Sequence, residues 1–230
     1  MANTVLILDP QSGGYGLARI KRLKDQTGIR VQIASGEALF LRTYTGKSPV
    51  SRQWDYFRIA APSTTLTGKW SLEFSEGGPT IPEKQEDISP DLWTDLGDSA
   101  MLHYAGLGVY SVSFEMSGLS ADQYMLDLGL VCESARIWLN GKEVGILYSN
   151  PFTILAGEFL KEGKNELIIE VANLMANRIR YLEKRRFNWK KFHDINFVNI
   201  QYEPFDASGW QPMKSGLGGP VQLIPLKKVH

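Results

Sequence analysis

Aromatic and amide side chains in the predicted loops are the residues of this sequence best suited to hold a small polar ligand. An aromatic ring offers a flat face to the apolar side of a sugar ring, and amide and guanidinium groups hydrogen-bond hydroxyls. The candidate platform residues are Trp93, Tyr104, Trp189 and Trp210, and the candidate polar partners are Asn150, Asn177, Arg178 and Asn196. Aromatic residues in sandwiches mostly pack the core, so core packing is the favoured alternative for each ring. Asn177 with Arg178 could equally cap a helix and pin it onto a sheet.

Carboxylates and histidines form no recognisable catalytic or zinc-binding pattern. The carboxylates nearest the main basic segment are Glu183, Asp194, Glu203 and Asp206. Their spacing does not place any two at the separation that glycoside hydrolysis needs, about 5 or 6.5–9.5 Å. The histidines are His103, His193 and His230, and they lack the spacing of zinc ligands. We therefore expect no catalytic residue, no metal-ligating cluster and no organic cofactor in this chain.

A structural calcium ion is the one ion that the sequence leaves open. Residues 75–100 are rich in proline, glycine and acidic residues, and they contain Asp87, Asp91, Asp95 and Asp98. Carboxylate oxygens are the ligands that Ca²⁺ prefers, but this spacing matches no EF-hand. The alternative is a solvated crossover between strands.

A basic segment follows the last central strand. Between Leu174 and Phe192 the apolar residues recur at helical spacing, and arginines and lysines are interleaved with a single acid, Glu183. We predict a short helical insertion over residues 174–193. Its basic face could be solvated, could dock on another domain, or could bind an acidic glycan such as a uronate-containing pectin. Its aromatics would also suit stacking on single-stranded nucleic acid, but the chain has no known nucleic-acid motif.

Composition excludes several classes of protein. Lysine plus arginine equals aspartate plus glutamate at 25 each, so the whole chain has no bias toward nucleic acid or an anionic membrane. The single cysteine, Cys132, allows no internal disulfide and is expected to be a buried thiol. No apolar run reaches the roughly 18 residues that span a bilayer. We find no signal peptide, so the location stays unknown, with periplasm or secretion expected if the chain is part of an exported hydrolase.

Alternating strands are the elements that must position these residues. Ala135, Ile137 and Leu139 share one face of a strand, and Asn140-Gly141 is the strongest short hairpin signal because both residues accept positive φ. The strands from Gly68 onward recur at short intervals, as in an all-β sandwich. Residues 1–47 form short strands, including one over 29–33, that are too few to make a stable domain alone.

Ordered short motifs carry a resemblance to a known family. They are Gly68-Lys-Trp70, Tyr104-Ala-Gly106, Gly108-Val-Tyr110, Leu126-Asp-Leu-Gly129, Ala135-Arg-Ile-Trp-Leu-Asn-Gly141, Gly145, Pro151-Phe152, Gly163-Lys-Asn165 and Asn173. Together they resemble the sugar-binding, galactose-binding-like jelly-roll domain of family 2-type glycoside hydrolases. The later stretches Asn173–Arg178, Trp189–Phe192 and Ser215–Val221 resemble the C-terminal sandwich of large α-L-rhamnosidase-type hydrolases.

The resemblance implies an all-β jelly-roll sandwich over residues 54–230, with a small β appendage over 1–47 that resembles the end of a preceding β-domain. In these families the catalytic carboxylates lie on a separate (β/α)₈ barrel, and this chain has no alternating βα units. We therefore expect a non-catalytic carbohydrate-associated module. It would contact plant or bacterial polysaccharide, or support a catalytic barrel. The alternatives are a structural domain that docks on a partner protein and an enzyme in its own right.

Overall fold

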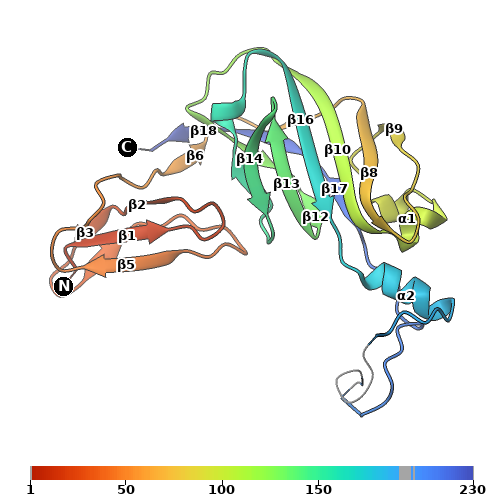
Figure 1. The fold of residues 1–230 in the computed structure, drawn as a ribbon. Helices are drawn as coiled ribbons and strands as arrows, with labels where there is room; N and C mark the ends of the chain where they lie inside the picture. Colours follow the sequence, from red (N-terminus) through yellow and green to blue (C-terminus); the bar gives the residue numbers. More distant parts are fainter. Residues whose placement is uncertain (1, 192–197, 199, 230) are drawn as a thin grey trace.

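The computed structural model describes residues 2–191, 198 and 200–229, which form a β-sandwich with a smaller group of strands at the N-terminus (Figure 1). Among these described residues, two α-helices and two short 3₁₀ turns interrupt the strands. This architecture confirms the predicted all-β sandwich with a short helical insertion. No helix among the described residues is long and apolar enough to cross a membrane.

The larger sheet of the sandwich has six antiparallel strands in the order β14-β13-β16-β10-β8-β9. Their bounds are β8 (Trp70–Gly78), β9 (Gln85–Ile88), β10 (Ala105–Met116), β13 (Ser134–Leu139), β14 (Lys142–Leu147) and β16 (Gly163–Ala172). The two longest strands pair without a shift from Leu107↔Ala172 to Met116↔Gly163. This pair forms the rigid centre of the sheet.

The second sheet has the order β15-β11-β18-β6, and β7 also pairs with β18. Its strands are β6 (Phe57–Ile59), β7 (Thr64–Thr65), β11 (Gln123–Asp127), β15 (Thr153–Leu155) and β18 (Gln222–Lys228). A further antiparallel pair consists of β12 (Leu130–Cys132) and β17 (Gly216–Gly219). The last strand therefore closes the sandwich from the far end of the chain.

Alternation along the strands produces one continuous core between these sheets. On β10, Tyr110 and Val112 are buried, whereas Val109 and Ser111, which alternate with them, are partly exposed. The predicted inward face of β13, which consists of Ala135, Ile137 and Leu139, is buried as expected. Burial of such apolar side chains contributes about 1.5–3 kcal/mol each, so the core dominates the stability of the fold.

The predicted Asn140-Gly141 hairpin is confirmed. Asn140 has φ +53° and Gly141 has φ +76°, and the two residues join β13 to β14 where Leu139 faces Lys142. The Asn140 side chain donates to the Phe159 carbonyl and to Oδ1 of the fully buried Asn165, both at 2.8 Å. These bonds tie the hairpin to the start of β16.

The N-terminal strands form a small core of their own, built around Val5, Ile7 and Ala18. The three-stranded sheet β2-β1-β5 comprises β1 (Thr4–Leu8), β2 (Tyr15–Leu17) and β5 (Phe40–Tyr44), and a second pair comprises β3 (Ile20–Arg22) and β4 (Thr27–Ile29). The predicted strand over 29–33 is wrong beyond Ile29, because no strand pairs with Val31 or Ile33 and both side chains are exposed. The predicted division between 1–47 and 54–230 stays a prediction.

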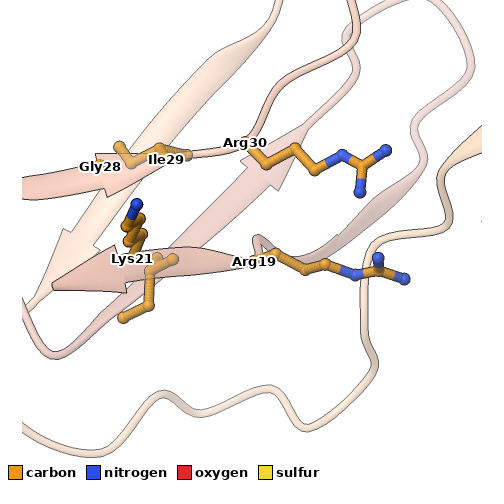
Figure 2. A pocket seen from close by; sticks show the side chains of 6 residues that line it. Arg19, Lys21, Gly28, Ile29 and Arg30 are labelled. Atoms are coloured by element: carbon orange, nitrogen blue, oxygen red, sulfur yellow. The ribbon is translucent and has the colours of Figure 1, made fainter. Parts of the chain in front are cut away.

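Tyr56 is the joint between these strands and the sandwich. Its side chain is fully buried, with the guanidinium carbons of Arg19 and Arg30 at 5.0 and 4.9 Å from the ring centroid. Figure 2 shows the two arginines extending side by side from the neighbouring strands β3 and β4, where they line an open pocket of about 370 Å³. Arg19 also donates to the carbonyl of Val229, which follows β18. These cations are therefore engaged in holding the two parts together.

Two helices lie at one end of the sandwich. The short α1 (Ser99–His103) follows a 3₁₀ turn over Trp93–Asp95, and α2 (Ala176–Lys184) follows β16. A second 3₁₀ turn spans Gly157–Phe159. Figure 1 shows α2 projecting from the sandwich, on the side away from the N-terminal strands. The helical insertion is shorter than residues 174–193, because the described chain from Arg185 to Lys191 has left the helix.

Candidate functional site

Trp93 and Tyr104 lie in the core. Both are fully buried, and both pack edge-on against Phe74 with ring centroids 5.6 and 4.9 Å away. The Tyr104 hydroxyl donates to the carbonyl of Glu76. Burial raises the pKa of this phenol. Neither ring has a face that a ligand could contact, so both are structural residues of the fold.

Asn177 and Arg178 hold α2 against the sandwich. Asn177 is 2% exposed, donates to the Met213 carbonyl at 2.7 Å and accepts from the Met213 amide at 2.8 Å. The guanidinium of Arg178 lies over Gly78, where an added Cβ would be 3.0 Å from Nη1. The alternative role given to this pair by the sequence, pinning the helix to the sheet, is the one that these contacts support.

Asn150 lies far from α2, at the contact with the N-terminal strands. It is exposed, and an added Cβ at Gly36 would be 3.0 Å from its carbonyl oxygen. Its neighbour Tyr148 donates to the carbonyl of Pro10 at 3.1 Å. Asn150 is therefore not brought together with the other candidates. Asn196 lies outside the described residues.

Trp189 and Trp210 are brought together by a third ring, Phe205. The Phe205 centroid lies 6.1 Å from that of Trp189 and 5.7 Å from that of Trp210, and both pairs are T-shaped. Trp210 is 42% exposed, and its carbonyl accepts a 2.6 Å hydrogen bond from Nε of Arg180 on α2. We call Trp189, Phe205 and Trp210 the aromatic cluster. Unlike the buried pair Trp93 and Tyr104, it groups predicted platform residues that keep part of their surface exposed.

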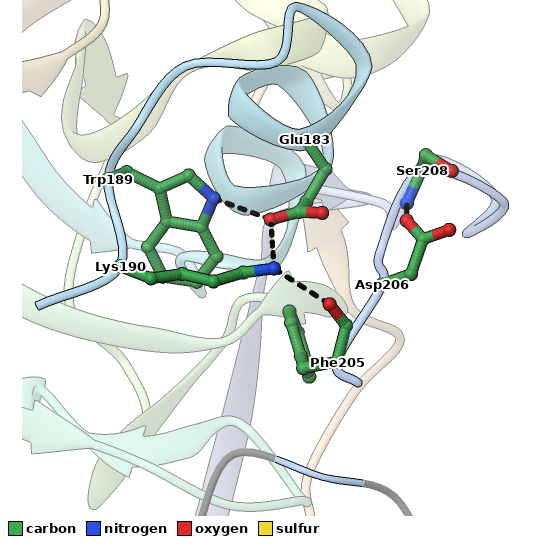
Figure 3. A network of polar contacts seen from close by, with 6 residues as sticks. All are labelled: Glu183, Trp189, Lys190, Phe205, Asp206 and Ser208. Atoms are coloured by element: carbon green, nitrogen blue, oxygen red, sulfur yellow. Dashed lines mark hydrogen bonds and ion pairs between the residues drawn. The ribbon is translucent and has the colours of Figure 1, made fainter. Parts of the chain in front are cut away.

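A polar network fixes the aromatic cluster to α2 (Figure 3). Oε1 of Glu183 accepts from the Trp189 indole at 2.7 Å and lies 3.0 Å from Nζ of Lys190. Lys190 in turn donates to the Phe205 carbonyl at 2.7 Å. The Glu183 side chain is 13% exposed, so this carboxylate is anchored inside the network. It holds the Trp189 ring in a fixed orientation.

Asp206 lies beside this network. The Ser208 amide donates to its Oδ1 at 2.7 Å. This hydrogen bond from Ser208 is the main cause that lowers the pKa of the Asp206 carboxyl, with a smaller contribution from Lys190. The carboxylate therefore stays ionised and fixes the turn that presents Trp210.

An open hollow lies next to the aromatic cluster, at the end of α2. It has a volume of about 310 Å³ and is lined by Glu183, Arg186, Phe187, Asn188, Trp189 and Lys190. We call it the α2 hollow. Two rings, Phe187 and Trp189, lie in it beside an amide and charged groups, and its volume is at the lower end of the range of about 300–1,000 Å³ for small-ligand sites.

Cations outnumber carboxylates around the α2 hollow. Among the described residues, no carboxylate lies within 4.0 Å of Arg180, Lys184, Arg185 or Arg186. His103 on α1 stacks on Tyr181 of α2 with centroids 4.7 Å apart. Its pKa is lowered, first by burial and then by Arg180, Arg185 and Lys184. The α2 surface therefore carries a positive potential.

The described residues contain no group of three or more His, Cys, Asp or Glu side chains that could hold a metal ion. Two of the aspartates considered for calcium have structural contacts instead. Asp98 accepts from the Ala100 amide at 2.7 Å and caps α1, and Asp87 lies 3.0 Å from Nζ of Lys69. A calcium site in residues 75–100 therefore has no support in the geometry.

The sequence did not indicate Phe205, Arg186 or the anchoring role of Glu183. Phe205 is distant from Trp189 in the sequence, and no periodic pattern connects the two residues. The one available signal was that Glu183 is the single acid in a basic segment. A lone carboxylate among cations and an indole is the natural acceptor for both.

Part of the chain resembles a curated protein in sequence. Over 129 residues, 55% of this chain, it is 31% identical to a Formosa agariphila protein named "Putative beta-glucuronidase", and the match spans 11% of that protein. No family model matches the chain.

The fold has solved counterparts. A rhamnosidase from Novosphingobium sp. PP1Y superimposes with a TM-score of 0.73 at 22% identity, over 97% of this chain and 21% of that chain. The chain has the fold of one part of that rhamnosidase. A beta-glucuronidase from an uncultured Clostridium sp. gives a TM-score of 0.47 at 20% identity, over 80% of this chain and 31% of that one. The rhamnosidase fold and the sequence similarity to the Formosa protein confirm the predicted resemblance to a domain of glycoside hydrolases. The chain spans 11% of the Formosa protein and 21% of the rhamnosidase.

Proposed function

We propose that this chain is a non-catalytic, carbohydrate-associated module of a glycoside hydrolase, with a galactose-binding-like jelly-roll sandwich as its scaffold. The observation that carries the proposal is the aromatic cluster, which Glu183 and Lys190 hold rigid beside the open α2 hollow. A fixed, partly exposed ring beside polar groups is the arrangement that sugar binding needs.

Each part of the site has a role in this proposal. Trp210 and Trp189 stack on the apolar face of a sugar ring, and Asn188 and Lys190 hydrogen-bond its hydroxyls. Trp93, Tyr104 and Asn177 support the scaffold without touching the ligand. Arg178 lies at the base of α2, where it positions the helix.

The relatives support the carbohydrate assignment. Their names describe a beta-glucuronidase and a rhamnosidase, both of which act on glycosides, and this chain corresponds to only part of each. Glu183 is engaged with Lys190 and Trp189, and this favours a structural over a catalytic role for that carboxylate. We expect no turnover of nitrophenyl glycosides, including the rhamnoside, by the 230-residue chain. Release of nitrophenol that tracks the purified chain would establish an enzyme instead.

The proposal is tested by glycan binding with matched tryptophan variants. A glycan array read at millimolar sensitivity should identify ligands of the wild-type chain, and Trp210→Ala should weaken them. The control is Trp138→Ala, because Trp138 is also partly exposed, under the guanidinium of Arg136 on β13, but is distant from α2. Equal loss in both variants, or an array without any ligand, would contradict direct sugar binding.

Exposed apolar side chains in the chain that follows α2 favour a second candidate, a structural domain that docks on a partner such as a catalytic barrel. Ile200 is 88%, Tyr202 74% and Phe187 56% exposed. Such residues are characteristic of docking surfaces when they are contiguous. This candidate predicts binding of an apolar dye that Ile200→Ser with Tyr202→Ser abolishes, together with an empty glycan array. Dye binding that the double substitution leaves unchanged would exclude it.

A further inference from the structure

Helix α2 ends in a turn that ordinarily contains glycine. The Arg186 amide donates to the Glu183 carbonyl at 2.9 Å, and the Phe187 amide donates to the Leu182 carbonyl at 3.0 Å. This is the pair of hydrogen bonds of a Schellman motif, and it requires a left-handed residue between the cap and Phe187. That residue is Arg186, with φ +57°.

An arginine in this place is strained. Glycine predominates at such positions because it has no Cβ to clash with the following carbonyl. The accompanying apolar contact is present, since the Phe187 ring lies 6.3 Å from that of Tyr181 on the last turns of α2. The motif would therefore form equally well with glycine, and its geometry gives no reason for a long cationic side chain.

The contacts of the Arg186 side chain do not account for it either. Arg186 is exposed, and no carboxylate among the described residues lies within 4.0 Å of it. The nearest acid in sequence, Glu183, is already bound to Lys190 and to the Trp189 indole. Strain that internal contacts do not compensate is characteristic of functional positions. What Arg186 does reach is the α2 hollow, which it lines together with Phe187 and Trp189.

The chemistry of these neighbours selects a class of ligand. A guanidinium presents two parallel N–H donors that match the two oxygens of a carboxylate, and a lysine cannot reproduce that fork. Phe187 and Trp189 beside it provide ring faces for the apolar side of a pyranose. We infer that Arg186 binds the carboxylate of a uronic acid unit whose ring lies in the α2 hollow. This inference rests on the proposed function and adds the charge of the recognised sugar.

The surrounding charges favour the same ligand. Lys184 and Arg185, like Arg186, have no carboxylate partner among the described residues. The carboxylate that lines the hollow, Glu183, is paired with Lys190, which reduces its repulsion of an entering anion. The same surface could attract an acidic protein segment. The hollow and its rings favour a sugar, because a concave site of about 310 Å³ suits a small ligand better than a flat partner surface does.

The test compares a galacturonic acid trisaccharide with its methyl ester, which keeps the rings and removes the charge. By isothermal titration calorimetry at low salt, the wild-type chain should bind the acid about tenfold more tightly than the ester. Arg186→Gly should bring this ratio close to one, while thermal unfolding stays unchanged or shifts upward because the strain is relieved. Arg186→Lys should retain part of the preference. Arg58→Gln, a substitution of an exposed arginine on β6, should leave the ratio intact.

Each other outcome has a defined meaning. If Arg186→Gly keeps the wild-type ratio, the inference is overturned and the proposed function stands. If the wild-type chain binds neither trisaccharide nor any neutral glycan, both the proposed function and the inference are contradicted. If a polyglutamate peptide competes with the acid trisaccharide and binds as tightly, the surface recognises acidic protein, and the inference is overturned.

Discussion

The sandwich core and the α2 region both contain aromatic side chains, which are buried in the core and partly exposed near α2. Trp93 in the core is fully buried and packs edge-on against Phe74, whereas Trp210 near α2 is 42% exposed and packs against Phe205. The core aromatics are surrounded by apolar side chains on both sheets. Those near α2 are held by a few polar bonds and keep part of their surface available. Exposure, and not residue type, therefore separates scaffold from candidate site.

The two regions also differ in how they are stabilised. In the core, stability comes from many apolar side chains, each of which contributes through burial. The α2 region depends on single polar side chains, above all Asn177 and Glu183. Substitutions in the first region should change folding, and substitutions in the second should change local order or binding.

The largest effect is expected from Trp93→Ala. Removal of this buried side chain leaves a cavity between Phe74 and Tyr104, so the free energy of unfolding should fall by about 3–5 kcal/mol. Urea denaturation followed by tryptophan fluorescence or circular dichroism measures this change. A loss below about 1 kcal/mol would mean that Trp93 is not a core residue.

A smaller loss is expected from Asn177→Ala. The substitution leaves the Met213 amide and carbonyl without their partner in a site that is 2% exposed, at a cost of about 1–3 kcal/mol. Because the contact joins α2 to the chain before β17, amide hydrogen exchange should accelerate in α2 and stay slow in β10 and β16. Uniform acceleration in all three elements would contradict the local role assigned to Asn177.

Trp210→Ala should lower glycan affinity and leave the stability of the fold almost unchanged. Its ring is partly exposed, so the free energy of unfolding should change by less than about 1 kcal/mol. Glycan affinity should fall by about tenfold, since one stacking face is removed. Calorimetric titration of the ligand found on the array gives the affinity. Unchanged affinity in a folded variant would remove Trp210 from the site.

The smallest effect concerns pH. The pKa of His103 is lowered from 6.5 by burial and by Arg180, Arg185 and Lys184, so the unfolded chain takes up this proton more readily than the folded one. Stability should therefore decrease as the pH falls below about 6.5 and level off below the lowered pKa. The difference between wild type and His103→Gln isolates this contribution. If the difference in the free energy of unfolding between the two proteins does not change between pH 7 and the onset of acid unfolding, the lowered pKa of His103 is contradicted.

Regular elements were predictable from the sequence because their signals are local. The alternation of Ala135, Ile137 and Leu139 predicted the inward face of β13, and Asn140-Gly141 predicted its hairpin because both residues accept positive φ. Trp93 was assigned to a solvated loop because a 3₁₀ turn has no periodic pattern from which burial can be inferred. The sequence therefore could not show that Trp93 and Tyr104 are buried, and the expectation that they form a platform depended on their exposure.

The candidate site was predictable only in part. Trp189 and Trp210 were named from their types, but Phe205, which joins them, is brought in by tertiary contacts that no short motif encodes. Arg186 could not be singled out either, because its significance lies in a backbone angle of φ +57°. A sequence shows that a segment is basic, and only the fold shows which of its cations lines a hollow.

The most direct test of the central claim is amide hydrogen–deuterium exchange of the 230-residue chain with and without a bound oligosaccharide. We expect slower exchange on binding in peptides from 176–191 and 205–213, which carry α2, the hollow and the aromatic cluster. Peptides from β13, β14 and β16 should not change, since these strands are scaffold. Protection confined to those strands or to the N-terminal sheet, with α2 unaffected, would contradict the central claim.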